Sequence, residues 1–314
     1  MKILITGGAG FIGSNLCDYL IEKNNKVVIL DNLETGNIKN LLKSKNKIKF
    51  FKVDITNMKK LKDKYFKKID VVFHLAALAD IVPSINNPEK YFNTNVKGTL
   101  NILEKCKKNK VKKLIYAASS SCYGIPKKLP INENAEIKPE YPYALTKYLG
   151  ETLVLHWAKV YNMHNISVRL FNAYGPRSRT NSNYGAMFGV FLSQKINNKP
   201  LTVVGDGKQT RDFLFISDLV SALHKTSILG KKGEIYNISS GKQVSINKIV
   251  KLMKHPKTCI PKRPGEPENL QGDISKIKKS LNWAPKVSIE KGIKIMVNNI
   301  NGWKSAPVWT PTKI

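Results

Sequence analysis

An apolar run, a glycine-rich turn and a helical repeat follow one another at the start of the chain, and this pattern constrains the fold most. Residues Lys2–Ile5 have the composition of a buried strand, and Phe11–Ile21 has apolar residues at helical spacing. Gly7, Gly10 and Gly13 lie between them, where glycine lets the backbone turn sharply and approach a ligand closely. The free N–H groups of a helix N-terminus bind phosphate. The pattern therefore predicts a strand–turn–helix unit that holds the pyrophosphate of a dinucleotide.

Strand-like and helical segments continue to alternate, which is typical of a parallel sheet covered by helices on both faces. The expected strands are Lys2–Ile5, Val27–Leu30, Ile48–Val53, Asp70–Leu75, Lys113–Ala118 and Ile166–Phe171, and the expected helices are Phe11–Ile21, Tyr91–Lys107 and Tyr143–Tyr161. We therefore predict an α/β fold with a Rossmann-type doubly wound parallel sheet over residues 1–171. Glycine and proline interrupt the sequence after that, so residues 172–314 are predicted to form mainly a smaller mixed α/β substrate domain, partly interleaved with late elements of the sheet.

Acidic residues end the second and third expected strands, and ligands bind at such strand ends in a doubly wound sheet. Asp31 follows Gly13 by about 20 residues, the position from which a carboxylate accepts hydrogen bonds from the adenosine ribose. The same carboxylate repels a 2′-phosphate, and no arginine is near it in the sequence, so NAD is favoured over NADP. Asp54 and Ile55 are expected to flank the adenine, although Asp54 also suits a helix N-cap.

Tyr143 and Lys147 lie one helical turn apart on one face of an expected helix. A phenol ordinarily titrates near pH 10, and a neighbouring ammonium together with the positive charge of an oxidised nicotinamide lowers that pKa. Ser119, at the end of the fifth expected strand, is placed to hydrogen-bond the same substrate oxygen. The three residues predict a site that moves a proton and a hydride on an alcohol or ketone, and Lys147 is also expected to bind the nicotinamide ribose.

The chain carries 53 basic and 22 acidic residues, a formal net charge of +31. Such a charge suits a nucleic-acid or membrane-surface partner when it forms a continuous stripe. Here the lysines are dispersed along the whole chain, so neither a nucleic acid nor a membrane is expected as a partner. No apolar stretch approaches the roughly 20 residues of a membrane span. Four scattered cysteines lack metal-type or redox spacing, so we expect reduced thiols, no metal site and a cytoplasmic protein.

Arginine is rare beside the many lysines. The chain contains Arg169, Arg177, Arg179, Arg211 and Arg263, all after Tyr143, where a substrate region is expected. Arginine binds phosphate and carboxylate through two parallel hydrogen bonds, a geometry that lysine lacks. Each arginine is therefore a candidate for binding a substrate phosphate or carboxylate, and a structural arginine–carboxylate pair is the alternative.

Longer stretches resemble the extended short-chain dehydrogenase/reductases, and among them the NAD-dependent nucleotide-sugar epimerase/dehydratase family. These stretches are Thr6–Gly13, Asp31–Gly36, His74–Ala77, Asn95–Thr99, Ser119–Gly124, Pro142–Lys147, Arg169–Arg177, Gly205–Asp212, Arg263–Glu266 and Asp273–Lys276. The resemblance implies that NAD is bound by Gly7, Gly10, Phe11, Ile12, Gly13, Asp31, Asn32, Asp54, Ile55, Leu75, Ala76, Ala77, Asn95, Tyr143 and Lys147. It also implies a homodimer formed through the helices near Asn95 and Tyr143.

The same resemblance implies a UDP-sugar as substrate, with Ser119, Tyr143 and Lys147 as catalytic residues. The substrate-binding residues that it implies are Asp80, Ser120, Ser121, Asn172, Val203, Arg211, Arg263, Glu266 and Leu270. Asn172 matches a residue that contacts the phosphates of the sugar nucleotide. Arg211 and Arg263 match arginines that clamp the pyrophosphate or the nucleotide ribose, and Glu266 matches an acid on that ribose.

The segment after the fifth expected strand separates the branches of this family. Dehydratases resemble one another in a Thr-Asp-Glu sequence there, because elimination of water needs an added acid and base, and decarboxylases carry a glutamate. This chain has Ser119-Ser120-Ser121-Cys122 and resembles the 4-epimerases. We therefore expect transient oxidation at C4 of the sugar and re-reduction on its other face, of the UDP-glucose/UDP-galactose type, with NAD kept bound.

Two residues bear on the choice of sugar. Asp80 is expected near the sugar as a hydroxyl ligand, an extra base or a solvated loop residue, and it disfavours an anionic sugar. Leu270 matches the position that limits space at C2, which favours glucose and galactose over N-acetyl sugars. A UDP-N-acetylhexosamine or UDP-uronic acid epimerase, a reductase and a dehydratase stay open as alternatives. So do a cofactor-sensing protein without catalysis and a nucleic-acid binder.

Overall fold

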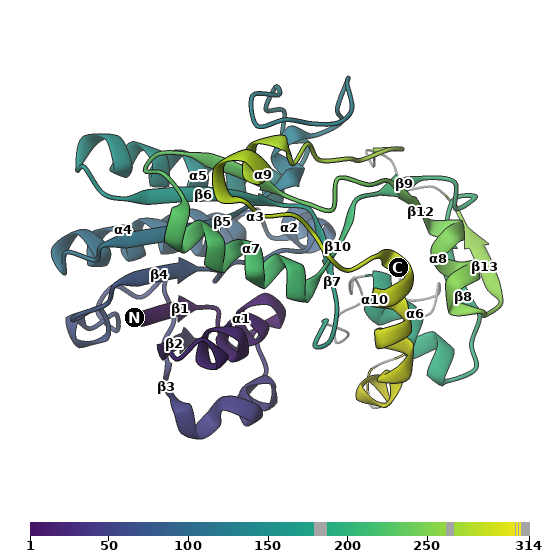
Figure 1. The fold of residues 1–314 in the computed structure, drawn as a ribbon, viewed down its shortest axis with the longest axis horizontal. Coiled ribbons are helices and arrows are strands. Elements are labelled where there is room, and N and C mark those ends of the chain that lie inside the picture. Colours follow the sequence, from purple (N-terminus) through teal and green to yellow (C-terminus); the bar gives the residue numbers. More distant parts are fainter. Residues whose placement is uncertain (179–186, 262–266, 305, 307, 309–314) are drawn as a thin grey trace.

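A parallel sheet forms the centre of the larger half of the molecule (Figure 1). The computed structural model describes residues 1–178, 187–261, 267–304, 306 and 308, and within them this sheet has seven strands. The strands are β1 (Lys2–Thr6), β2 (Lys26–Asp31), β3 (Ile48–Lys52), β4 (Val71–His74), β5 (Lys113–Ser119), β6 (Asn165–Leu170) and β11 (Ile235–Ile238). Their order is β11-β6-β5-β4-β1-β2-β3, and every neighbouring pair is parallel. The predicted doubly wound sheet is confirmed.

Alternate side chains of the strands face two separate hydrophobic cores. On β1, Ile3 and Ile5 belong to one core, and Leu4 belongs to the other. The helices α1 (Phe11–Glu22) and α7 (Ile216–Leu229) cover the first face, and α4 (Gly98–Lys108) and α5 (Pro142–Val160) cover the second (Figure 1). Because both faces are covered, the strands read as continuous apolar runs, as parallel strands do.

The long helix expected over Tyr91–Lys107 is interrupted. The structure has α3 (Pro88–Phe92), a π-helical turn (Asn93–Lys97) and then α4. Gly98 follows the turn, and a Cβ added there would lie 2.7 Å from the Ile55 side chain. The wider turn directs the Asn95 side chain into the interior, where it is 1% exposed. Such turns are frequent at functional sites.

The smaller half is built from short two-stranded pairs and the helices that cover them. The pairs are β7 (Asn172–Tyr174) with β10 (Phe213–Phe215), β8 (Leu201–Val204) with β13 (Lys257–Ile260), and β9 (Thr210–Arg211) with β12 (Val244–Ser245). The helices are α6 (Met187–Ile196), α8 (Ile246–Met253) and α10 (Ile289–Asn298). The chain passes between the halves repeatedly, because β11, α7 and α9 (Ser275–Leu281) return to the sheet after β7 has left it (Figure 1).

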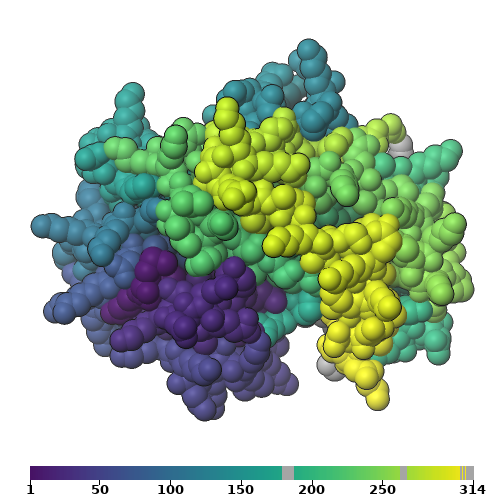
Figure 2. Space-filling model, viewed as in Figure 1, coloured from purple at the N-terminus to yellow at the C-terminus, as the bar shows by residue number. Residues whose placement is uncertain are grey.

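Short helices complete the larger half and the C-terminal end. They are α2 (Ile81–Asn86) and the 3-10 helices Ile38–Lys47, Asp63–Tyr65, Ser120–Tyr123 and Ile300–Trp303. In the space-filling view a notch separates the purple and blue N-terminal part from the yellow helix α10 (Figure 2). Residues from both sides of this notch line the cavity described below.

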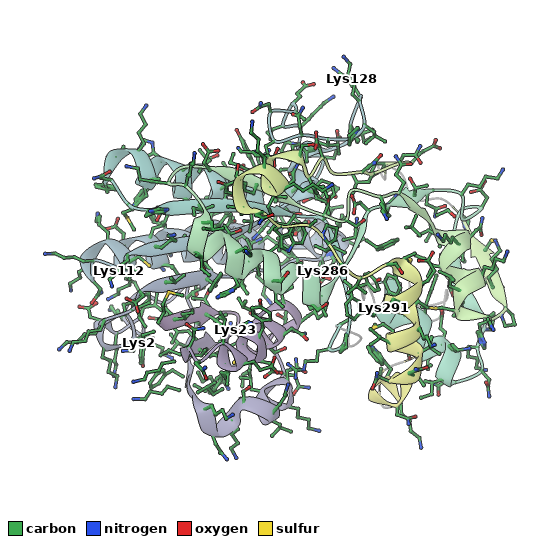
Figure 3. All side chains as sticks on the ribbon, in the orientation of Figure 1. Lys2, Lys23, Lys112, Lys128, Lys286 and Lys291 are labelled. Carbon is green, nitrogen blue, oxygen red and sulfur yellow. The ribbon has the colours of Figure 1, made fainter. Side chains whose placement is uncertain are left out.

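The surface lysines are spread over both halves of the molecule. Of the six labelled in Figure 3, Lys2 lies on β1, Lys291 on α10 and Lys23 just after α1. The others, Lys112, Lys128 and Lys286, lie in separate loops, so the six do not gather on one element. No helix among the described residues has the length and apolar character needed to cross a membrane. The placement of the lysines agrees with the prediction of dispersed, solvated charge.

Candidate active site

A cavity of about 1280 Å³ lies at the carboxyl ends of the central strands. β1 lies between β2 and β4, so the chain order reverses at this point of the sheet, where doubly wound sheets bind their ligands. The expected site residues that line the cavity are Gly7, Gly10, Phe11, Ile12, Gly13, Asp31, Asn32, Asp54, Ile55, Leu75, Ala76, Ala77, Asp80 and Asn172. The structure thus brings together residues that lie up to 165 positions apart, from Gly7 to Asn172.

The glycine loop has no room for side chains. Gly7 has a φ of +72°, and an added Cβ would lie 2.7 Å from the backbone nitrogen of Ala76. At Gly13 an added Cβ would lie 2.2 Å from the Gly7 carbonyl oxygen. The helix α1 begins directly after Gly10 without a side-chain cap and without an acidic residue in its first turn. Its first N–H groups therefore stay available to an anion, as a dinucleotide pyrophosphate requires.

The Asp31 carboxylate is held at the end of β2 by two backbone groups. Its Oδ2 accepts from the Ala9 N–H at 2.9 Å, and its Oδ1 accepts from the Leu33 N–H at 2.8 Å. Burial raises the pKa of Asp31, and the two backbone hydrogen bonds act against that rise. Each carboxylate oxygen keeps a further lone pair for a ribose hydroxyl, which fits an adenosine at this strand end.

Asp54 lies beside Asn32 at the rim of the adenosine end. It accepts from the Thr56 N–H at 2.8 Å, from the Thr56 hydroxyl at 2.7 Å and from Asn32 Nδ2 at 3.3 Å. Burial raises the pKa of Asp54, but these hydrogen bonds outweigh it and leave the pKa below its usual value. The carboxylate is therefore ionised and held by the turn Asp54–Thr56. Its position in the cavity wall is compatible with a place beside the adenine and with a capping role.

A chain of hydrogen bonds fixes the floor of the cavity between β1 and β4. The Thr6 hydroxyl bonds His74 Nδ1 at 2.7 Å, His74 Nε2 bonds the Thr99 hydroxyl at 2.9 Å, and that hydroxyl donates to the Asn95 carbonyl at 2.6 Å. Burial lowers the pKa of His74 to about 3, so the imidazole is neutral. The strand ends are thus tied to the π-helical turn without a buried charge.

Asn95 supports the cavity from behind and does not line it. Its Oδ1 accepts from the Leu78 N–H at 2.8 Å, and its Nδ2 donates to the Leu78 carbonyl at 3.0 Å and to the Thr146 hydroxyl at 3.0 Å. Asn95 thus lies behind the residues that line the cavity, and the cofactor contact expected for it stays a prediction. Its amide joins the segment after β4 to the helix α5, because both Nδ2 donors and one Oδ1 acceptor position are used within the protein.

Ser119, Tyr143 and Lys147 lie next to the cavity, just beyond the residues that line it. Ala117, two residues before Ser119, is part of the lining. Ser119 lies close enough to the Tyr143 phenol to lower its pKa, and the Tyr143 N–H donates to the Ser84 hydroxyl at 3.1 Å. Lys147 is 4% exposed, and its Nζ lies 4.5 Å from the centroid of the Tyr116 ring. The three groups expected to act together thus come from the end of β5 and one face of α5.

Burial shifts both titrating groups toward their neutral forms. It raises the pKa of the Tyr143 phenol, although the residue as a whole is partly exposed, and the hydrogen bond with Ser119 lowers that pKa in part. The negative charge of Asp80 adds to the rise. Burial lowers the pKa of Lys147 to about 8. Without a further positive charge, the site therefore holds a protonated phenol near neutral pH.

The residues expected at the sugar take different positions. Asn172 and Asp80 line the cavity, and Ser120 and Ser121 form the 3-10 turn after Ser119, with the Ser121 hydroxyl 2.8 Å from Ser119 Oγ. Leu270 is 7% exposed and packs in a small cluster with Tyr123, Ile131 and Phe171. Val203 is 1% exposed in the hydrophobic core and is not among the residues that line this cavity, and its expected substrate contact stays a prediction.

Arg169 forms a structural arginine–carboxylate pair, which was the alternative to phosphate or carboxylate binding for each arginine. Its guanidinium bonds Glu151 at 2.6 Å, and Nη1 donates to Tyr123 Oη at 2.9 Å and to the Glu133 carbonyl at 3.0 Å. A role in substrate binding is therefore corrected. The group is 3% exposed and joins β6, α5 and the turn after β5. A buried charge of this kind needs such complete pairing.

Arg211 and Arg177 have different surroundings. Arg211 Nη1 donates to the carbonyls of Thr210 at 2.9 Å and Glu268 at 3.3 Å, on β9 of the smaller half. Arg177 lines the cavity and pairs with Asp18. Arg179, Arg263 and Glu266 lie outside the described residues.

Sequence reasoning missed the wall that the C-terminal segment contributes. The cavity is also lined by Asn298, Asn299, Asn301, Gly302, Trp303 and Ala306, and by Pro176, Arg177 and Ser178. Trp303 is 5% exposed in the main core, and the Ser193 hydroxyl of α6 donates to the Ala306 carbonyl at 3.3 Å. No motif marks this segment, and only Trp303, one of 4 tryptophans, signals that it is packed.

The fold and the site together define an enzyme of the extended short-chain dehydrogenase/reductase class. A family model described as GDP-mannose 4,6 dehydratase matches residues 4–296. A putative UDP-glucose 4-epimerase from Methanocaldococcus jannaschii is 39% identical over 304 residues, which cover 94% of this chain and 97% of the relative. The chain therefore belongs to the nucleotide-sugar epimerase/dehydratase family, and the resemblance drawn from its sequence is confirmed.

Solved structures of this family share the whole fold. The UDP-glucose 4-epimerase of Thermotoga maritima, solved with UDP-glucose, superposes with a TM-score of 0.89 at 32% identity and covers 96% of this chain and 99% of its own. The UDP-glucuronic acid 4-epimerase of Bacillus cereus, solved with UDP-glucuronic acid and NAD, gives 0.88 at 33% identity and covers the same shares. The relatives thus act on different sugars within one architecture.

Proposed function

We propose that this protein is an NAD-dependent nucleotide-sugar 4-epimerase of the UDP-glucose/UDP-galactose type. One observation carries the proposal: the cavity at the strand ends contains a glycine loop and a buried carboxylate, Asp31, and the end of β5 with Ser119 and the helix α5 with Tyr143 and Lys147 lie next to it. A cradle without Cβ atoms and a carboxylate at the strand end fit NAD, and Asp31 disfavours the 2′-phosphate of NADP.

The residues of this chain supply the proton chemistry. Tyr143 Oη takes the proton of the sugar C4 hydroxyl, the Ser119 hydroxyl donates a hydrogen bond to the same oxygen, and the Lys147 ammonium favours the phenolate. The NAD held by the glycine loop and Asp31 would supply the hydride acceptor and donor for C4 of the sugar. After the 4-keto sugar has rotated, Tyr143 gives the proton back to the oxygen at C4. No net oxidation occurs, so the enzyme needs no second redox substrate.

The turn after β5 supports epimerisation over dehydration or decarboxylation. Elimination of water needs an acid and a base beside the C4 chemistry, and Ser120–Tyr123 contains no carboxylate. Asp80 is the acidic residue of the cavity wall whose charge reaches Tyr143. It repels an anionic sugar, which favours a neutral hexose over a uronic acid. Leu270 is proposed to limit the space at C2.

The assembly and the compartment are also proposed. Ile85, Phe92 and Leu145 are 57%, 49% and 45% exposed, and they lie on α2, α3 and α5, which pack against one another. Such an apolar patch fits a homodimer formed through these helices. The free thiols of Cys17, Cys106 and other described cysteines fit the reducing cytoplasm. The dispersed lysines leave a nucleic-acid partner without a binding stripe.

The test is a set of incubations of the purified protein without added cofactor. UDP-glucose, UDP-galactose, UDP-GlcNAc, UDP-GalNAc and UDP-glucuronic acid are each supplied, and the products are resolved by ion-pair chromatography and NMR. We expect interconversion of UDP-glucose and UDP-galactose. Conversion of UDP-glucuronic acid alone, or of the N-acetyl sugars alone, would show that the enzyme is a 4-epimerase of that sugar and not of glucose and galactose. A keto or unsaturated product would replace epimerisation by net redox or elimination chemistry.

A further inference from the structure

Arg177 has a backbone conformation that an arginine rarely adopts. Its φ is +70°, in the left-handed region that favours glycine. Gly175 lies two residues before Arg177 and also has positive φ. The loop therefore has a glycine at one such position and an arginine at the other. Eight other described non-glycine residues, Lys68 and Lys110 among them, also have positive φ, so the conformation of Arg177 shows only that its surroundings hold it in place.

The guanidinium of Arg177 is paired on one side alone. Nη2 donates to Asp18 Oδ2 at 2.6 Å. Nη1 is buried and has no hydrogen-bond partner among the described residues, although Arg177 itself lines the cavity. A buried guanidinium N–H without an acceptor is unfavourable. Nη1 has almost no accessible surface in this structure, so a small shift of the Arg177 side chain would be needed before an anion in the cavity supplies the missing acceptor.

The loop that carries Arg177 is fastened to the helix α1. Asn15 Nδ2 donates to the Pro176 carbonyl at 3.1 Å and to the Phe11 carbonyl at 2.9 Å, and the Ser178 hydroxyl donates to the Gly175 carbonyl at 2.6 Å. Together with the Asp18 pair, these bonds hold Arg177 beside the first turns of α1. That helix begins at the glycine loop, with uncapped N–H groups and no acidic residue in its first turn.

We propose that Arg177 binds the pyrophosphate of the bound dinucleotide through Nη1. The inference rests on the NAD site proposed above and adds to it a cation supplied by the smaller half of the chain. Arginine suits this task because its second nitrogen stays paired with Asp18 while the first binds the phosphate. The dinucleotide is then held by the glycine loop from the sheet and by Arg177 from the loop after β7. This arrangement retains the cofactor between turnovers.

The experiment compares wild type, Arg177→Gln, Arg177→Lys and Asp18→Asn. The NAD content per chain is measured after acid release, and the thermal shift is measured with added NAD, ADP, adenosine and UDP. We expect Arg177→Gln to weaken the binding of NAD and ADP by roughly 10- to 100-fold, the effect of one lost charge-assisted hydrogen bond. Adenosine lacks the phosphates, so its binding stays unchanged. Arg177→Lys is expected to retain part of the affinity.

Asp18→Asn is the matched control, because its amide oxygen still accepts from Nη2. We expect it to lower the NAD affinity no more than about threefold, less than one charged hydrogen bond. Equal losses of NAD in Asp18→Asn and Arg177→Gln would overturn the inference, because Arg177 would then only hold the loop. Unchanged NAD and ADP binding in Arg177→Gln, or a loss confined to UDP, would overturn it as well. A wild type that binds no NAD would instead refute the proposed function.

Discussion

At the scale of single residues, burial opposes the ionisation of both Tyr143 and Lys147. The phenol keeps its proton and the ammonium is weakened, because both charged forms lose solvation. The positive charge of an oxidised nicotinamide beside them would favour the phenolate. The proton acceptor is therefore expected to form only when NAD is in place, which links cofactor binding to the first chemical step.

Tyr143→Phe should abolish turnover and leave NAD bound. Loss of the phenolic oxygen removes the group that takes and returns the proton, and a general acid–base residue contributes typically 10²- to 10⁴-fold to the rate. Turnover is measured by NMR on the sugar nucleotide, and bound NAD is measured after acid release. Activity near that of wild type would refute the mechanism, and Tyr148→Phe on the same helix serves as the control.

Lys147 should give the stability a pH dependence of definite sign. Burial lowers its folded pKa to about 8 from 10.5, so the unfolded chain binds more protons between these values and stability rises with pH there. Between pH 7.5 and 9.5 the free energy of unfolding of wild type should rise by about 2 kcal/mol relative to Lys147→Met. Urea denaturation of both proteins at equal NAD content measures this. Parallel pH profiles of the two proteins would show that the ammonium is not desolvated.

At the scale of elements, the glycine loop and the π-helical turn show different limits of sequence reading. The loop is visible in the sequence, because glycine is needed where Gly13 touches the Gly7 carbonyl. The turn at Asn93–Lys97 is not visible, because apolar periodicity reports the buried face and not the hydrogen-bond pattern of the backbone. Asn95 consequently supports the segment after β4 from behind.

Gly13→Ala should weaken NAD binding by roughly 10- to 100-fold, because the added Cβ would displace the backbone that donates to the pyrophosphate. Gly10→Ala should have a smaller effect, since its Cβ would lie 3.2 Å from the Gly7 carbonyl oxygen. Gly302→Ala, on the other wall of the cavity, meets no atom within 4 Å and is the control. Calorimetric titration with NAD measures all three. A similar loss at Gly13 and Gly302 would contradict the steric explanation.

At the scale of the whole molecule, the two halves share one cavity. The sheet supplies the glycine loop and Asp31, and the smaller half supplies Asn172, Arg177 and the wall around Trp303. The lining residues Asn298, Asn299, Asn301, Gly302, Trp303 and Ala306 lie beyond the stretch that the family model matches, yet they complete this wall. The cavity is thus a product of the packing between halves and depends on the stability of both.

Trp303→Ala should destabilise the fold by about 3–5 kcal/mol, the usual result of truncating a buried aromatic residue. It should also weaken NAD binding by about 10-fold, since one wall of the cavity is lost. Trp283→Ala is the control, because Trp283 is equally buried but does not line the cavity. Chemical denaturation and NAD titration of both variants separate the two effects. Equal NAD affinity of the two variants would show that the C-terminal wall does not contact the cofactor.

The sequence by itself determined the features that depend on local backbone chemistry and periodicity. The glycine loop, the carboxylate of Asp31 at a strand end and the one-turn spacing of Tyr143 and Lys147 are all readable along the chain, because each is set within a few residues. The alternation of strands and helices predicted the parallel sheet for the same reason.

Only the tertiary structure decided how side chains distant in sequence share their hydrogen bonds. Arg169 and Arg177 look alike in the sequence, but Arg169 is fully paired with Glu151 inside the core, and Arg177 keeps one buried nitrogen unpaired beside the cavity. The same holds for Val203 in the core and for Trp303 in the cavity wall. Pairing, burial and strain are properties of packing between segments, so no pattern within one segment can specify them.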